Sequence, residues 1–312
     1  MNSLGSKSES LSRPPLESIM ATNTLRLALL QLATTLNKSE NLRAASMKIK
    51  KAATSGAHMV CLPACFGYPI GGRGFRASAE TIPGETSEML SQSARENGVY
   101  LIGGSMTEID GKGRRYNTCL VYGPDGSMVA KHRKLHLVDI DNPGVMTFRE
   151  ASLVSPGNRL TTFDTPFCKV GVGVCYDIHF APLAHIYAQL GCKLLVFPSA
   201  FNTIVGPIYQ ELHQRSRAVD GQVYVALASP ARSGRTAYVP WGHSMLVDPL
   251  GKVVQSAGTE EAVLMGEVDL DHLSTVRKQM PIMKHHRNDL YDVIRVAGDQ
   301  FSDRDDSDCG AA

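Results

Sequence analysis

Two kinds of hydrophobic pattern alternate along most of the chain. Short runs of apolar residues, typical of buried strands, are followed by stretches in which apolar residues recur at helical spacing. Two of the helical stretches end at Gly56 and Gly98, as expected where a left-handed residue closes the last turn. The expected strands are 25–32, 58–63, 99–105, 169–178, 193–201 and 222–231. The expected helices are 40–55, 86–98, a segment that ends at Gly191, and 207–221.

Two further segments predict hairpins, because alternating runs flank a tight turn. Residues 116–137 turn at Pro124-Asp125-Gly126, and residues 241–258 turn between Pro249 and Gly251. The chain therefore repeats one order of elements, strand–helix–strand–helix–strand and then a hairpin. Two such halves predict sheets with helices on their outer faces, which is an α/β layered fold in a single domain.

Composition and charge exclude some classes of function. The chain has 312 residues, of which 43% are hydrophobic and 20% charged, as in ordinary globular proteins. Its net charge is +2, with 32 basic and 30 acidic side chains mixed along the chain. This excludes the basic stripe of a nucleic-acid-binding protein, and no apolar run approaches the length of a membrane span.

The two ends differ from the middle in composition. A Ser-rich start predicts a disordered N-terminal extension over residues 1–23, and the acidic end predicts a disordered tail over 301–312. The folded domain is expected over 24–300. The seven cysteines have no regular spacing, which predicts reduced thiols and an intracellular protein.

Cys175 is the strongest candidate for chemistry. Gly171 and Gly173 precede it on an apolar strand and a helical pattern follows, so a sharp turn would aim its thiol at a helix N-terminus. Such a position lowers a thiol pKa, and the backbone N–H of Tyr176 would be free to hold an oxyanion. The alternative is a buried core cysteine, and the local pattern alone does not decide between the two.

Other candidate residues have simple structural interpretations. Lys134 lies in a run of alternating basic residues, which is typical of a solvated face, yet this run enters a long loop over residues 139–156. His132 and His136 are interpreted as surface or strand residues. Cys61 and Cys65 lack a second pair of ligands, so no metal is expected.

Several segments together resemble one family, the carbon–nitrogen hydrolase (nitrilase) superfamily, and within it the omega-amidase, or Nit2-type, branch. The resemblance runs from about residue 25 to 292 and rests on these segments: RKLHLVDIDNPG, TFREASLVSPG, GVGVCYDI, FPSAFN, QRSRAVDGQVYV and WGHSMLVDP. It implies a four-layer αββα sandwich that dimerises through its helices and uses neither metal nor cofactor. It also implies a small-molecule amide substrate, in the cytoplasm or alternatively in mitochondria.

The same resemblance assigns roles to individual residues. Cys175 matches the nucleophile, and Lys134 matches the lysine that holds the oxyanion together with the backbone N–H of Tyr176. Glu150 matches a second glutamate, which would orient this lysine and position the amide. The implied reaction is attack of the thiolate on a primary amide, loss of ammonia and hydrolysis of the thioester. His179 and Phe201 fall at substrate-binding positions.

The chain departs from the family pattern at two important positions. Ala64 stands where the family has its general-base glutamate, and His179 stands where it has an arginine that would hold the far carboxylate of the substrate. Pro182 and Gln210 also differ from the family pattern. Ala64 is explained by an engineered substitution, by natural loss of activity, or by a neighbouring carboxylate that substitutes, for which Glu150 is the candidate.

Three hypotheses for function follow. The first is an omega-amidase-like hydrolase of small dicarboxylate monoamides such as α-ketoglutaramate and α-ketosuccinamate. The second is a catalytically impaired homologue that binds a metabolite or a partner protein in the same pocket. The third, a papain-like protease that pairs a cysteine with His243, leaves Lys134 without a role.

Overall fold

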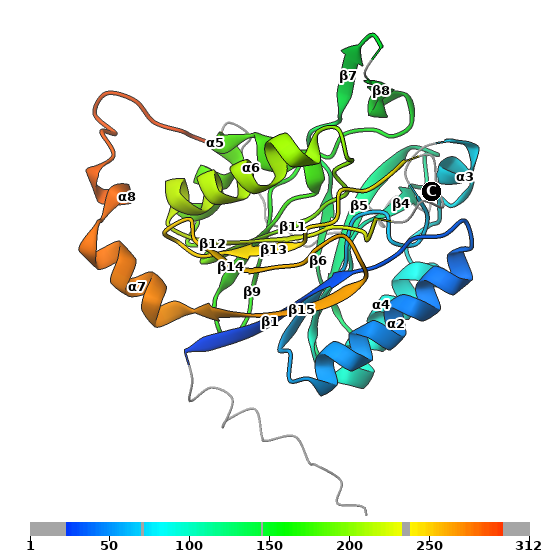
Figure 1. Cartoon of the computed structure of the whole chain (residues 1–312), viewed down its shortest axis with the longest axis horizontal. Coiled ribbons are helices and arrows are strands. Elements are labelled where there is room, and N and C mark those ends of the chain that lie inside the picture. Colours follow the sequence, from blue (N-terminus) through cyan, green and yellow to red (C-terminus); the bar gives the residue numbers. More distant parts are fainter. Residues whose placement is uncertain (1–22, 70–71, 145, 233–237, 296–312) are drawn as a thin grey trace, which may run out of the picture.

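The computed structural model describes residues 23–69, 72–144, 146–232 and 238–295. In this part of the chain two sheets pack face to face, with helices on both outer sides (Figure 1). The first sheet has the order β15-β1-β2-β3-β5-β4, and β6 also pairs with β5. Its strands are β1 (Thr24–Gln31), β2 (Met59–Cys61), β3 (Tyr100–Ile102), β4 (Met106–Ile109), β5 (Arg115–Tyr122), β6 (Met128–Arg133) and β15 (Ala262–Asp269).

The second sheet has the order β14-β13-β12-β11-β10-β9. Its strands are β9 (Thr161–Asp164), β10 (Lys169–Val172), β11 (Leu194–Pro198), β12 (Tyr224–Ala228), β13 (Met245–Val247) and β14 (Val253–Ser256). β10, β11 and β12 run parallel, as do β1, β2 and β3 in the first sheet. A separate hairpin of β7 (Asp139–Asn142) and β8 (Met146–Arg149) stands above the body in Figure 1.

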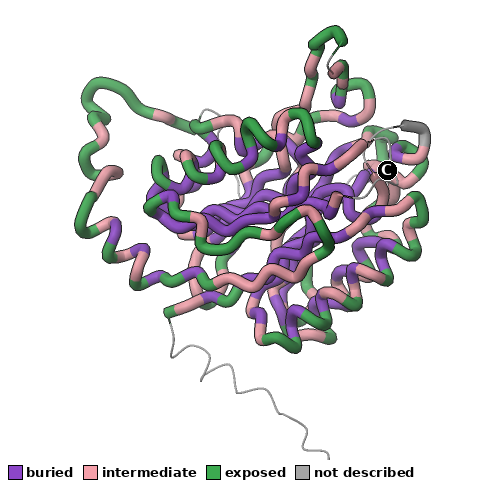
Figure 2. Tube along the Cα trace, viewed as in Figure 1, coloured by how far each residue is buried: buried purple, intermediate pink, exposed green. Residues whose placement is uncertain are grey.

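The helices complete four layers. α2 (Lys38–Thr54) and α4 (Glu85–Asn97) cover the first sheet, and α5 (Ala181–Gln189) and α6 (Gly206–Gly221) cover the second. Between the sheets lies an apolar cluster from both, including Leu29 of β1 and Val196 of β11. Figure 2 shows the buried residues gathered in these inner strands. The fold is α/β and has the αββα order that the family resemblance implied.

Most of the expected elements are present near their expected bounds. Gly98 ends α4 with a left-handed φ of 57°, as the pattern predicts. The folded elements from β1 to α8 (Ile282–His285) lie inside the predicted domain of residues 24–300. The predicted extension lies outside the described residues except for Asn23, and the predicted tail of residues 301–312 lies wholly outside them.

Other expectations were wrong. The strand expected over 169–178 ends at Val172, and Cys175–His179 form a 3-10 turn before α5. The loop expected over 139–156 contains the β7–β8 hairpin and a 3-10 turn, Glu150–Ser152. The pattern also missed β4, β9, β15, α3 (Gly72–Ala77), α7 (Leu270–Gln279) and α8. Short or half-exposed elements such as these carry little hydrophobic periodicity.

Among the described residues, no helix is both long enough and apolar enough to cross a lipid bilayer.

Candidate active site

The candidate residues meet where the parallel strands end. Cys175 follows β10, Phe201 follows β11, and Ala64 follows β2 of the facing sheet. Lys134 comes directly after β6, and Glu150 comes directly after β8. In open α/β sheets the carboxyl ends of the strands are the usual place for a binding site.

Cys175 itself makes the sharp turn. Its φ is +51°, a left-handed value that is uncommon for a residue with a side chain. Gly171 and Gly173 are absent from the positive-φ positions, so the expectation that they make the turn was wrong. They are needed for close packing instead, because a Cβ on Gly173 would lie 2.5 Å from the ring of Phe197. The turn therefore projects the thiol from a tightly packed strand end.

The protonation of this thiol differs from the expectation. Burial raises the pKa of Cys175 above its ordinary value, although the Lys134 ammonium and the backbone N–H of Ala200 both act to lower it. The nearby carboxylates of Glu150 and Asp177 raise it further. The predicted low pKa was wrong because Cys175 opens a short 3-10 turn in a buried place, and α5 begins only at Ala181. The resting sulfur is a neutral thiol at pH 7.

Lys134 and Glu150 form a buried ion pair. The ammonium donates to Glu150 Oε2 at 2.5 Å, and both side chains are almost fully buried, at 3% and 7% exposure. Burial acts to lower the pKa of Lys134, but Glu150 and Cys175 outweigh it and the pKa is raised. Lys134 thus stays charged beside the thiol. The predicted solvated face was wrong for this residue.

The Glu150 carboxylate is fully engaged in holding this arrangement. Its Oε2 also accepts the backbone N–H of Val138 at 2.9 Å, and its Oε1 accepts from the Asn117 amide at 3.3 Å. With Lys134 as its third partner, the carboxylate fixes the lysine and the chain that follows it. Such contacts are what the orienting role implied by the family resemblance would require.

Ala64 lies beside the thiol. The N–H of Ala64 donates to the carbonyl of Ser199 at 3.2 Å. Ala200, which follows Ser199 in the chain, donates its N–H to the Cys175 sulfur. The methyl group is buried in the apolar cluster between the sheets. At the neighbouring Cys65, burial raises the pKa to about 12, with Glu150, Lys134 and Cys175 close enough to influence it. Position 64 therefore lies next to residues that contact or influence the thiol, and its side chain offers no group that could accept a proton.

The backbone N–H of Tyr176 was predicted to hold an oxyanion. It lies in the first turn of the 3-10 segment, where N–H groups have no partner inside the helix. Among the described residues no carbonyl accepts from its N–H. The Lys134 ammonium lies 6.0 Å from the centre of the Tyr176 ring.

Asp177 is a site residue that sequence reasoning missed. Its carboxylate accepts the backbone N–H of Val174 at 2.9 Å and contacts His132 Nε2 at 3.1 Å and His136 Nδ1 at 2.7 Å. Although burial opposes it, the hydrogen bonds from the two histidines hold the pKa of Asp177 well below its usual range. His132 lies in β6, in agreement with its interpretation as a surface or strand residue, and its side chain is completely buried. The acidic residue two positions after the cysteine was the available signal.

His179 lies in an aromatic cluster. Its ring centre is 5.7 Å from Phe201, 4.5 Å from Tyr176 and 4.1 Å from His213. Burial, and then His213 and the nearby cations, lower the pKa of His179 to about 4. The imidazole is therefore neutral at pH 7 and brings no positive charge to a carboxylate.

Two more missed residues shape this end of the site. Arg217 of α6 donates to the carbonyls of Ile178 and His179, both at 3.0 Å, and so clamps the segment after the nucleophile. The Tyr238 hydroxyl donates to the carbonyl of Ala200, whose N–H in turn contacts the thiol. Both lie far from Cys175 in the sequence, and no local pattern marks them.

The structure also bears on two alternatives. His243 packs against Trp241 at 4.5 Å, and within the described residues no hydrogen bond joins it to Cys175, as a papain-like pair would need. Gln210, one of the departures from the family pattern, is buried and donates to the carbonyls of Gly242 and His243. Over the same part of the chain, no three His, Cys, Asp or Glu side chains converge as a metal site requires.

Comparison with known proteins agrees with this geometry. Residues 26–278 match the carbon-nitrogen hydrolase family. The chain is 55% identical to the omega-amidase NIT2 of Mus musculus over 271 residues, which are 87% of this chain and 98% of the mouse protein. It is 54% identical to that of Homo sapiens over 270 residues, which are 86% and 98% of the two chains.

Solved structures give the same result. Saccharomyces cerevisiae Nit3, a member of branch 10 of the nitrilase superfamily, superposes with a TM-score of 0.77 at 38% identity over 85% of this chain and 97% of its own. The C. elegans NitFhit protein superposes with a TM-score of 0.81 at 30% identity over 87% of this chain and 67% of its own. The chain therefore belongs to the carbon–nitrogen hydrolase (nitrilase) superfamily, in its omega-amidase branch.

Proposed function

We propose that the protein hydrolyses the terminal amide of small dicarboxylate monoamides, such as α-ketoglutaramate and α-ketosuccinamate, to the acid and ammonia. The observation that carries this proposal is the Lys134–Glu150 pair, buried at 2.5 Å beside Cys175 at the carboxyl ends of the strands. A charged lysine held next to a thiol can stabilise an oxyanion formed on attack by sulfur. The similarity to omega-amidases supports this substrate class.

The reaction would follow from these positions. The Cys175 sulfur adds to the amide carbonyl carbon, and Lys134 and the Tyr176 N–H hold the negative oxygen. The tetrahedral adduct collapses, the C–N bond breaks, and ammonia leaves with the proton that the thiol gave up. Water then attacks the thioester, which releases the acid and restores the thiol.

Removal of the proton from the Cys175 thiol is expected to be the slow step of this reaction. The Cys175 thiol is neutral at rest, because its pKa is raised, and Ala64 offers no acceptor. Glu150 and Asp177, the carboxylates that influence this thiol, are both occupied by other donors. Since a positioned acid–base group contributes about 10²–10⁴ in rate, we infer a slow enzyme.

A second function is favoured by the same departures. Because Ala64 cannot accept a proton and His179 is neutral, the site resembles a binding site more than an efficient catalyst. In this alternative the protein is a catalytically impaired homologue that binds a metabolite or a partner through the same pocket.

Restoring the missing base distinguishes the two functions. Ammonia release from α-ketoglutaramate is measured for the protein with Ala64 and for its Ala64→Glu and Ala64→Gln variants. The hydrolase proposal expects Ala64→Glu to raise kcat/KM by about 10²–10⁴, with little change in Ala64→Gln, which has similar size but cannot take a proton. Cys175→Ala in the Ala64→Glu background should abolish release. Equal, negligible release from all variants would contradict the hydrolase and favour the binding protein.

We propose further that the protein is a homodimer in a reducing compartment, the cytosol or alternatively the mitochondrion. Ile208 and Leu212, one turn apart on α6, are each 57% exposed, and Tyr209 between them is 38% exposed. An exposed apolar patch on one helix is typical of an interaction surface. A reducing compartment keeps the nucleophilic thiol from oxidation.

A further inference from the structure

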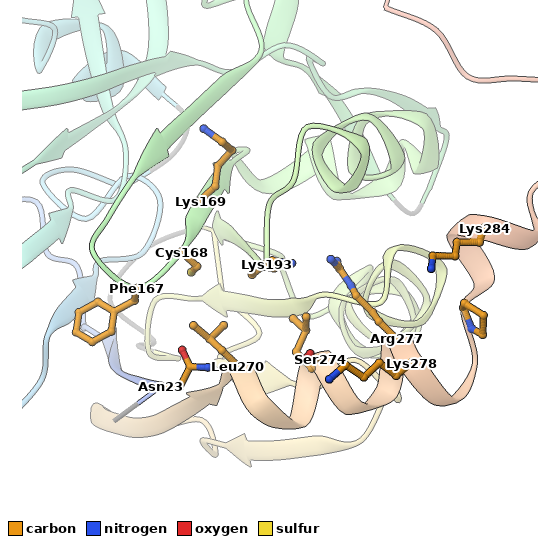
Figure 3. A pocket seen from close by; sticks show the side chains of 12 residues that line it. Asn23, Phe167, Cys168, Lys169, Lys193, Leu270, Ser274, Arg277, Lys278 and Lys284 are labelled. Carbon is orange, nitrogen blue, oxygen red and sulfur yellow. The ribbon is translucent and has the colours of Figure 1, made fainter. Parts of the chain in front are cut away.

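A pocket lies at the amino ends of β10 and β11 in the second sheet, the ends away from Cys175. Lys169 opens β10 and Lys193 precedes β11, whereas the candidate active site follows the other ends of these strands. α7 and α8 close the pocket on the outer side (Figure 3). Its volume is about 570 Å³, within the range of small-molecule sites. No step of the proposed hydrolysis uses this pocket.

The lining of the pocket is strongly basic. Five of its residues are cations and none is acidic, although the whole chain carries a net charge of only +2. The cations are Lys169, Lys193, Arg277, Lys278 and Lys284. This local excess of positive charge is not explained by the composition of the chain.

The carboxylates near the rim do not neutralise this charge. Asp164 pairs with Lys169 at 2.8 Å, and Asp271 accepts from the Asn23 amide at 2.7 Å. Over the described residues no carboxylate is found within ion-pair distance of the other four cations, Lys193, Arg277, Lys278 and Lys284. Four cations therefore share the pocket without a counter-charge of their own.

Two of these cations face each other in a half-buried position. Figure 3 shows the Lys193 ammonium turned toward the Arg277 guanidinium across the pocket. Burial and the nearby Arg277 lower the pKa of Lys193, and burial lowers that of Arg277. Arg277 is held in place by the carbonyls of Gln222 and Gly221. Holding two like charges together away from water is unfavourable unless an anion joins them.

We propose that this pocket binds a small polyanion that carries two or more phosphate or carboxylate groups. Lys193 and Arg277 would contact one oxyanion group inside, and Lys278 and Lys284 would contact another at the rim. Leu270 and Leu273, at the base of the pocket, give the ligand an apolar surface to rest on. A single inorganic ion would leave most of the volume empty.

Binding to the whole chain is measured by isothermal titration calorimetry, with inorganic pyrophosphate and citrate as separate probes. We expect saturable binding of at least one probe, and the probe that binds identifies the oxyanion class. Lys193→Gln/Lys278→Gln should weaken binding about tenfold or more, since hydrogen bonds to charged groups are lost. Lys50→Gln/Lys112→Gln removes the same charge from exposed positions elsewhere and should change binding less than about twofold.

Two further variants complete the binding experiment. If the first double variant fails to fold, as judged by thermal unfolding, Lys278→Gln/Lys284→Gln replaces it, because both lysines are exposed. Cys175→Ala should leave binding unchanged, which separates this site from the candidate active site. The proposal is overturned if neither probe saturates, if the control variant loses as much affinity as the pocket variant, or if Cys175→Ala abolishes binding.

Discussion

Cys175 holds a left-handed backbone conformation that a residue with a side chain adopts at a cost of about 1–3 kcal/mol. The surroundings impose this conformation. Gly173 packs against the Phe197 ring, and the N–H of Val174 is fixed by the Asp177 carboxylate. Strain of this kind persists where neighbouring contacts over-determine the backbone, which is common at functional sites. The nucleophile is thus placed by its neighbours rather than by its own preference.

Alkylation of this thiol tests its protonation. Iodoacetamide should label Cys175 ahead of the other half-buried thiol, Cys168. Burial raises the pKa of Cys168 to about 12 even with Lys193 nearby, whereas at Cys175 both Lys134 and the backbone N–H of Ala200 oppose the effect of burial. Since the pKa of Cys175 is also raised, its labelling rate should still climb between pH 7 and 9. Mass spectrometry of the labelled peptides gives both rates.

Lys134→Met serves as the matched variant for this measurement. It should slow labelling of Cys175 and leave Cys168 unchanged. A rate for Cys175 that levels off below pH 8 would instead mean a lowered pKa, contrary to the burial argument.

The charge at position 179 decides how the far end of the substrate is held. The pKa of His179 is about 4, so its imidazole is neutral from pH 5 to 8. In the Ala64→Glu background, His179→Arg should lower KM for α-ketoglutaramate about tenfold by supplying a guanidinium fork. KM for butyramide, which has no carboxylate, should stay the same. An equal change for both amides would show that the substitution acts on the pocket generally.

At the scale of elements, Asp177 ties three segments together. It joins His132 of β6, His136 in the chain after β6, and Val174 in the turn after β10, so it connects the two sheets beside the nucleophile. Removal of one partner from a buried charged network leaves the remaining groups unsatisfied. The position of Lys134, which lies between the two histidines in sequence, depends on this connection.

Asp177→Asn should therefore destabilise the fold by about 3 kcal/mol at pH 7, measured by urea unfolding. The pKa of Asp177 is depressed in the folded state, so its contribution is present above about pH 4, the unfolded value, and is lost as pH falls toward the folded pKa. The difference between the two proteins should shrink below pH 4. Asp141→Asn, at an exposed position in the β7–β8 hairpin, should change stability by less than about 0.5 kcal/mol. A difference that grows in acid would contradict this assignment.

At the scale of the whole molecule, the two ends of the parallel strands carry different functional groups. The carboxyl ends of the parallel strands gather Cys175, Lys134 and Glu150, and the opposite edge of the second sheet holds the basic pocket around Lys193 and Arg277. On α6, the apolar side chains of Ile208 and Leu212 are exposed to solvent. The proposed catalysis, anion binding and dimer formation would thus use separate surfaces of one sandwich.

The proposed dimer is tested on this outer face. Ile208→Glu/Leu212→Glu should convert a dimer into a monomer, since burying two carboxylates in an apolar interface is strongly unfavourable. Size-exclusion chromatography with light scattering gives the mass. Leu36→Glu, which is as exposed but lies in the chain before α2, should leave the mass unchanged. A natural sequence that is already monomeric would contradict the proposal.

The sequence by itself determined the strands and helices with strong apolar periodicity, such as β1 and α4, because burial imposes that periodicity directly. Its motifs also determined the family and the identity of Cys175, Lys134 and Glu150 as the candidate machinery. Short elements such as β4 and the β7–β8 hairpin could not be predicted, since few of their positions must be apolar.

The tertiary structure decided what depends on burial and on contacts between distant residues. The raised pKa of Cys175, the neutral His179 and the Asp177 network all result from groups brought together from different strands. The basic pocket likewise joins residues from β10, the start of β11, and α7, which are far apart in the chain. Electrostatic free energies depend on distance and solvent exposure in three dimensions, and neither quantity is written in local sequence.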